Sequence, residues 1–152
     1  MTGADLSGTA LEGANFAQSV LNSADLTNAD LTGADLAYTL LGNAKLIATL
    51  DGANMVHAVM QDANLSGASL KGANLTYAYM MDSTMSYTDL SYANLRFARF
   101  DNANLEYANF YGADLTGANF TDAYVVGAIW SNTTCPDGTN SDNDGNTCAG
   151  HF

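Results

Sequence analysis

A period of five residues fills most of this chain and restricts the folds it can adopt more than any other feature. A large apolar residue, called here the centre of a quintet, recurs every five positions from Leu6 to Leu46 and again from Leu50 to Trp130. The 26 centres comprise 16 Leu, four Met, four Phe, one Val and one Trp, and Ala stands two positions before the centre in 21 quintets. A helix repeats about every 3.6 residues and a strand about every two, so neither regular element fits the consensus A-(D/N)-L-x-x. The pattern instead predicts a chain that turns a corner every five residues, with one large and one small residue facing inward.

A longer period lies over this one. The position before the centre is usually polar, but it is apolar at Val20, Leu40, Val59 and Tyr79, at intervals of 20, 19 and 20 residues. A second set of these positions is acidic or amidic throughout: Asn15, Asp35, Asn54, Asn74, Asn94 and Asp114. Four quintets therefore form one coil, and we expect equivalent residues to stack from coil to coil.

The interval of 19 coincides with a missed step in the repeat. Ala44 is followed by Ala48, only four positions later, instead of the usual five. We interpret residues 44–47 as a quintet that lacks its last residue. Because each coil of a solenoid contacts only its neighbours, such a loss distorts the fold locally and does not spread. The alternative is a functional kink that presents Lys45 and Ile47.

Residues 4–130 resemble the pentapeptide-repeat family, and the resemblance rests on 26 consecutive quintets. It implies an all-β fold, a right-handed quadrilateral β-helix with four quintets in each coil. Residues 1–130 would form this solenoid, with about 6.5 coils and a length of roughly 31 Å at the usual spacing of stacked strands. Residues 131–152 would form a small C-terminal capping tail.

The tail contains the only Pro and both cysteines of the chain. We expect Trp130 to close the last coil as an end cap, with the tail folded over it. Cys135 and Cys148 can form a disulfide or remain free thiols, and the cytoplasm would favour thiols. The tail is similar to that of cyanobacterial and plant thylakoid-lumen members of the family, and this resemblance implies a disulfide. It also implies location in the thylakoid lumen or periplasm if a signal peptide was removed; the alternative is the cytoplasm.

The N-terminal coil has no such cap in the sequence. We expect an additional segment, a partner or a homodimer through this coil to cover its centres, because exposed apolar surface usually marks a contact. The uncovered centres would be Leu6, Leu11, Phe16 and Leu21.

The charge of the chain disfavours two classes of partner. Sixteen acidic residues against four basic ones give a net charge of −12, which repels nucleic-acid phosphates and anionic membranes. We therefore predict no nucleic-acid partner and no membrane partner. The chain also has no apolar run long enough for a membrane-spanning helix.

The sequence offers little for catalysis, and we predict that the protein is not an enzyme and needs no cofactor. His57 and His151 are the only histidines, and no motif pairs either with a nucleophile. Stacked carboxylates such as Asp5 and Asp25 resemble a glycosidase pair, but a wet convex wall is expected to have no cleft that would shift their pKa. Residues 140–145 match the opening of a calcium loop. Asn, Asp and Gly are also ordinary turn residues, so we predict no metal site.

The outer walls provide the best candidate for a binding site. An apolar stripe on one wall is either a binding face or a stabilising stack of neighbouring side chains. Its predicted members are Val20, Leu40, Val59, Tyr79 and Arg99, flanked by Tyr38, His57, Tyr77 and Phe97.

Two functions follow from these observations. The first is a non-enzymatic structural module, an acidic rod that presents stacked side chains to a protein partner. The second is a DNA-mimicking regulator, because some family members protect DNA gyrase by presenting an acidic rod in place of duplex DNA. The acidity fits this second function, but the cysteine tail and the absence of a recognisable inserted loop do not.

Overall fold

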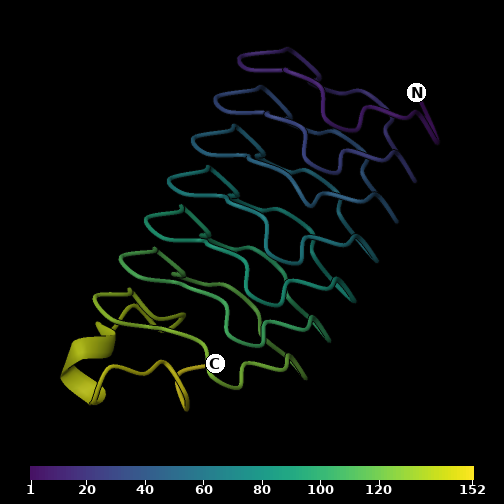
Figure 1. The fold of residues 1–152 in the computed structure, drawn as a ribbon. Coiled ribbons are helices and arrows are strands. Elements are labelled where there is room, and N and C mark those ends of the chain that lie inside the picture. The colour runs from purple at the N-terminus through teal and green to yellow at the C-terminus, as the bar shows by residue number, and fades with distance from the viewer.

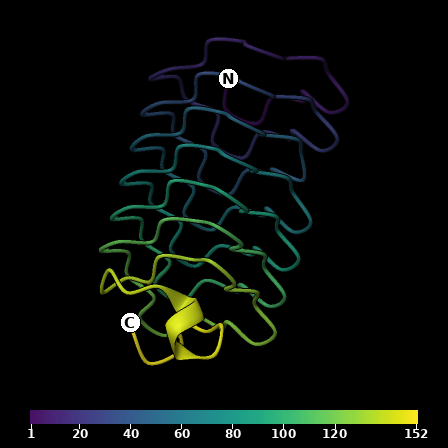
Figure 2. The same ribbon diagram turned by 90° about the vertical axis from the view of Figure 1, so that its left-hand side faces the viewer.

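The protein is a four-sided solenoid in which successive coils stack along one axis (Figures 1 and 2). The computed structural model describes the backbone of residues 1–152 and every side chain except that of Asp144. The one helical element in the described chain is η1, a 3-10 helix at Ser141–Asp144, which lies beside the last coils. No helix in the described residues has the length and hydropathy needed to span a membrane.

Single-residue parallel bridges join each coil to the next and confirm the predicted stacking. They form four columns, one on each wall, and the residues of a column are 20 apart on either side of the missed step. Across the missed step the interval is 19, as in the bridge between Leu40 and Val59. The bridges remain single because the chain turns after every quintet, so no longer strand can form.

Each corner is a tight turn closed by a hydrogen bond from the next small residue. Ala24 N–H, for example, donates to Leu21 O at 3.0 Å, with Ser23 between them at a φ of 58°. The last residue of a quintet has a positive φ and lies in the left-handed region of backbone conformation, which Gly and Asn adopt most easily. The structure nevertheless places Tyr, Phe and His there at several corners.

The interior is filled by the centres and by the small residues between them. Every centre from Leu21 to Leu115 is fully buried, and the corresponding Ala residues are almost fully buried. Leu6, Leu11 and Phe16 are only partly buried, as predicted for the N-terminal coil. The prediction was wrong for Leu21, which is fully buried. Met1 occupies the equivalent centre position one coil earlier, since Ala4 N–H donates a hydrogen bond to Met1 O and closes the same kind of turn.

At the C-terminal end the coil geometry continues past the predicted boundary at residue 130. Thr134 bridges to Asp114, so the last bridge of the solenoid lies one quintet beyond Trp130. Thr133 occupies the small position and Cys135 the position of a centre, and both are fully buried. Cys135 and Cys148 form a disulfide, with their Cα atoms 5.4 Å apart.

Candidate functional site

The predicted apolar stripe is one continuous column of the solenoid, here called the apolar wall. Bridges join its members in chain order, and Asn119 follows as a further member: Val20, Leu40, Val59, Tyr79, Arg99 and Asn119. Val20, Leu40 and Tyr79 expose about two-fifths of their surface although they are apolar or aromatic. The column formed by the acidic and amidic residues, from Asn15 to Asp114, lies on a neighbouring wall. One wall is therefore much more apolar than the wall beside it.

Aromatic rings stack along the corner that borders the apolar wall. The centroids of Tyr38 and His57 are 4.8 Å apart, those of His57 and Tyr77 are 5.0 Å apart, and those of Tyr77 and Phe97 are 5.0 Å apart. The ring planes are within 20° of parallel, so neighbouring rings cover each other's faces. The stack consequently presents mainly ring edges to an approaching partner.

A glycine ends this stack at its C-terminal side. A Cβ added at Gly117 would lie 2.6 Å from the ring of Phe97, so the ring lies flat against the glycine backbone. Gly117 has a φ of 71°, which suits glycine, and the missing side chain leaves room for the ring. The corner thus carries rings on four consecutive coils and none on the fifth.

Two arginines lie at the same end of the apolar wall, Arg99 as a member of the column and Arg96 beside Phe97. Arg99 donates two hydrogen bonds to the Asp101 carboxylate, at 2.9 and 3.1 Å, and lowers the pKa of Asp101. Arg96 donates to Asp114 at 3.2 Å and lies 5.8 Å from the ring centroid of Phe97. Predicted members from Val20 to Arg99 therefore do lie together, and their role in binding stays a prediction.

The basic residues do not form a positively charged surface. Lys45 pairs with Asp25 and Lys71 with Asp89, so each of the four basic side chains lies within 3.4 Å of an aspartate. The charges that remain outside these pairs on the repeat walls are carboxylates.

The stacked carboxylates are held in their ionised form. Asp5 bridges to Asp25 in the next coil. Hydrogen bonds from Ser7 lower the pKa of Asp5, and a hydrogen bond from Lys45 lowers that of Asp25 to about 2. A glycosidase general acid needs a raised pKa, so the charge state of this pair does not suit that chemistry.

The segment that resembles a calcium loop forms turns. Asn140 caps η1 by accepting a hydrogen bond from Asp142 N–H, and Gly145 follows with a φ of 75°. The carboxylate of Asp142 accepts from Asn132 N–H at 2.7 Å. The Asp144 side chain lies outside the described residues. Among the side chains that are described, no cluster of three His, Cys, Asp or Glu residues could hold a metal ion.

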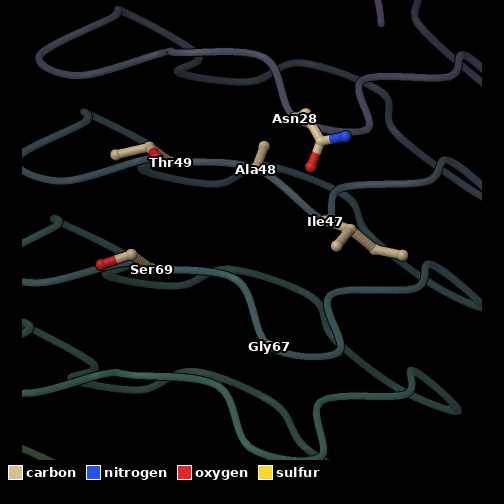
Figure 3. Close-up of a pocket in the computed structure, with 6 residues that line it drawn as sticks. All are labelled: Asn28, Ile47, Ala48, Thr49, Gly67 and Ser69. Carbon is tan, nitrogen blue, oxygen red and sulfur yellow. The ribbon is translucent and has the colours of Figure 1, made fainter. Parts of the chain in front are cut away.

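The missed step creates a second feature, a surface cavity of about 190 Å³ called here the notch. Figure 3 shows the chain at Ile47 and Ala48 cutting across the corner, whereas the coils through Asn28 and Gly67 turn farther out. The Asn28 carboxamide points from one coil toward the notch, and Thr49 and Ser69 lie along its side.

Two backbone hydrogen bonds of the regular pattern are lost at the notch. The turn residue of each coil normally donates its N–H to the coil that follows, as Asn28 N–H does to Ile47 O at 2.8 Å. Within the described chain, the missing residue leaves Ser66 O without the corresponding donor. The turn bond between Ala48 N–H and Leu46 O is also absent there.

The sequence located this irregularity but did not predict the cavity. Ile47 lines the notch, whereas Lys45 points to Asp25, with 2.7 Å between Nζ and the carboxylate. The four-residue interval between Ala44 and Ala48 was the available signal. The cavity depends in addition on Gly67, one coil further along.

Comparisons with known proteins agree with this architecture. A family model for pentapeptide repeats matches residues 1–37, 48–76 and 83–122 in eight copies, and the gap at 38–47 contains the missed step. QnrB1, a plasmid-mediated fluoroquinolone resistance protein, is 22% identical with a TM-score of 0.69, covering 87% of this chain and 70% of that chain. At this identity the match shows a shared fold. No curated protein sequence matches the chain.

Two other solved structures are similar in sequence but superpose less well. HetL, a pentapeptide repeat protein involved in heterocyst differentiation regulation in the cyanobacterium Nostoc, is 25% identical with a TM-score of 0.43, covering 92% of this chain and 80% of that chain. A pentapeptide repeat protein from the thylakoid lumen of Arabidopsis thaliana is 27% identical with a TM-score of 0.24, covering 80% of this chain and 68% of that chain.

Proposed function

The chain belongs to the pentapeptide-repeat family, whose members form right-handed quadrilateral β-helices, and we propose that it is a non-enzymatic rod that binds a protein partner through the apolar wall. The observation that supports this most is the exposure of one apolar column over consecutive coils, from Val20 to Tyr79. A contiguous apolar stripe on a soluble surface is typical of an interaction site. Partners bind such a rigid surface without first ordering it, which lowers the entropic cost of association.

The chemistry of the wall restricts the partner that we propose. The stack from Tyr38 to Phe97 offers ring edges, and the wall itself offers aliphatic side chains. A partner with apolar and aromatic side chains and few acidic ones fits best, because the rest of the rod is acidic. We propose no nucleic-acid partner, no membrane partner and no cofactor.

A double variant of the wall tests this function. Replacing Leu40 and Tyr79 with Asn should lower partner binding at least about tenfold, because both apolar side chains leave the contact. The control replaces Thr84, an exposed residue on another wall, with Asn. Partners captured by chemical crosslinking would then be purified and their binding measured by calorimetry. Equal affinity for the wall variant and the native protein would contradict the proposal.

A DNA-mimicking regulator is the alternative, and the charge distribution is the observation that favours it. All four basic side chains pair with aspartates, and the chain as a whole carries a net charge of −12. Gyrase is the enzyme that the family resemblance suggests. A supercoiling assay separates the two functions: inhibition at micromolar protein favours the alternative, and unchanged supercoiling discards it.

The ends of the rod are part of the same proposal. We propose a solenoid of about 6.5 coils at the usual strand spacing. Its C-terminal end would be capped by Trp130 and the tail, and its N-terminal coil would be covered by a second copy of the chain. Trp130 is only 5% exposed and its ring stacks on Phe110 at 4.6 Å, which supports the cap.

We propose an oxidising compartment for this protein, the thylakoid lumen or periplasm, with the cytoplasm as the alternative. The disulfide between Cys135 and Cys148 is the supporting observation, because disulfides persist mainly in such compartments.

A further inference from the structure

We propose that the notch and the bare corner next to it bind an aromatic residue within a peptide segment of a partner protein. This site lies on a different corner from the apolar wall and does not depend on the function proposed for that wall. The argument rests on two neighbouring vacancies, one for a peptide group and one for a ring.

The first vacancy is polar. The missing residue would have supplied one peptide unit, and its absence leaves unused backbone groups on both sides of the notch. Ala48 N–H lacks an acceptor among the described residues, and Ser66 O lacks a donor there. The Asn28 carboxamide, which borders the same cavity, also has no hydrogen-bond partner within the described chain. A ligand that carries both an amide N–H and an amide C=O matches these groups.

The second vacancy is an unfilled ring position at the end of an aromatic stack. The turn residues of this corner after the notch are Gly67, Tyr87, Tyr107 and Gly127. Tyr87 stacks on Tyr107, with ring centroids 5.0 Å apart and planes 19° from parallel. A Cβ at Gly67 would meet nothing within 4 Å, and no described ring covers the face of Tyr87 on that side. Tyr87 is 66% exposed, the largest value among the exposed apolar and aromatic side chains described.

An aromatic side chain fits this second place for the same reason that rings stack elsewhere in the molecule. On the corner beside the apolar wall, four consecutive coils carry rings at spacings of 4.8 to 5.0 Å. A partner's ring over Gly67 would continue the Tyr87–Tyr107 stack at a similar spacing, and offset stacking favours it beyond simple burial.

The two vacancies adjoin each other, because Gly67 lines the notch. A single residue can therefore place its peptide group in the notch and its ring against Tyr87. An aliphatic residue would use the first place only, and a free aromatic ring would use the second only. The combination specifies an aromatic residue in a peptide.

The test is an NMR titration of the intact protein with N-acetyl-phenylalanine amide. We expect saturable shifts of the Ile47, Ala48 and Gly67 amides, with a Kd of about 1 mM for a ligand of this size. N-acetyl-alanine amide, which lacks the ring, should bind at least tenfold more weakly. Replacing Gly67 with Tyr fills this ring position with a side chain of the protein itself and should abolish binding.

The matched control is Gly72→Tyr. Gly72 has the same turn conformation, with a φ of 63°, and nothing within 4 Å of an added Cβ, but it lies on the next corner. The structure already holds Tyr77 and Tyr87 at φ values of 58° and 60°, so both variants are expected to fold. Gly72→Tyr should bind the probe as the native protein does. The proposal is overturned if the probe causes no saturable shift, if it shifts other residues only, or if Gly67→Tyr retains native affinity.

Discussion

At many quintets the Asp or Asn before the centre accepts a hydrogen bond from a backbone N–H that the coil leaves open. Asp5 Oδ1 accepts from Ser7 N–H at 3.0 Å, and Asn74 Oδ1 accepts from Thr76 N–H at 3.2 Å. The same bond, from the residue two positions later, recurs at many quintets along the rod. Asp and Asn are the residues whose short side chains reach that donor, which explains the D/N position of the consensus.

The turn residues show a second requirement at the residue scale. A non-glycine residue in the left-handed region costs roughly 1 to 2 kcal/mol. Tyr77 and Phe97 occupy that region, and the contact between their rings stabilises the folded state by roughly 0.5 to 1.5 kcal/mol. Stacking of this size is comparable to the cost of the conformation.

A substitution at a centre should be severe. Replacing Leu75, which is fully buried, with Ala should lower the free energy of unfolding by about 2 to 5 kcal/mol, because it leaves a cavity among rigid coils. Urea unfolding measures this change. The control is Thr84→Ala, an exposed wall residue that should alter stability by less than about 0.5 kcal/mol. A loss below about 1 kcal/mol at Leu75 would mean that the interior relaxes around the cavity.

At the scale of elements, the tail is bound to the last coil by several independent contacts. Ser141 N–H donates to Thr133 O at 2.9 Å, and the Ser141 hydroxyl donates to Trp130 O. The Phe152 ring stacks on Phe120 at 4.9 Å. The disulfide joins the final centre position of the solenoid, Cys135, to this tail.

Reduction of the disulfide should loosen the tail. The bridge closes a 13-residue separation, and opening it should destabilise the protein by up to about 3 kcal/mol through chain entropy. Thermal unfolding with and without reductant measures the effect, and the emission of Trp130, the only Trp, reports on its exposure. A variant with Ala in place of Cys135 and Cys148 should not respond to reductant. An unchanged melting temperature in the native protein would show that the other contacts suffice to hold the tail.

At the scale of the whole molecule, many carboxylates are more acidic than usual despite the large negative charge. Lys45 lowers the pKa of Asp25 from 3.8 to about 2, and the Thr139 hydrogen bond, with help from His151, lowers that of Asp137 to about 2. Hydrogen bonds also lower the pKa of Asp30. Folding therefore favours the ionised form of these groups.

The protein should consequently lose stability in acid. A carboxyl whose pKa is depressed on folding contributes stability above its unfolded value of 3.8, and this is lost as the pH falls toward about 2. The urea midpoint, measured from pH 7 downward, should fall over that window. A variant with Asn in place of Asp25 and Asp137 should show a smaller change. A midpoint that rises in acid would mean that relief of charge repulsion outweighs the lost hydrogen bonds.

Much of the architecture could be predicted from spacing alone. Inward and outward positions, the bridge between Leu40 and Val59, and the location of the missed step all follow from the intervals between residues. Stacking along the apolar wall was predicted on the same basis. The burial of Leu21 was missed because the turn from Met1 to Ala4 was not assigned to a quintet, and the bridge at Thr134 was missed because Cys135 is not a typical centre.

The sequence by itself determined the register of this protein, since a solenoid coil contacts only its neighbours and a fixed interval sets which residues meet. The tertiary structure decided what the exposed surface offers. Whether the Tyr87 ring keeps an open face, and whether Ser66 O finds a donor, depends on the path of the adjacent coils at one corner. Intervals along the chain do not contain that path, because side-chain rotamers and the local backbone response to a missing residue arise only when the coils are packed together.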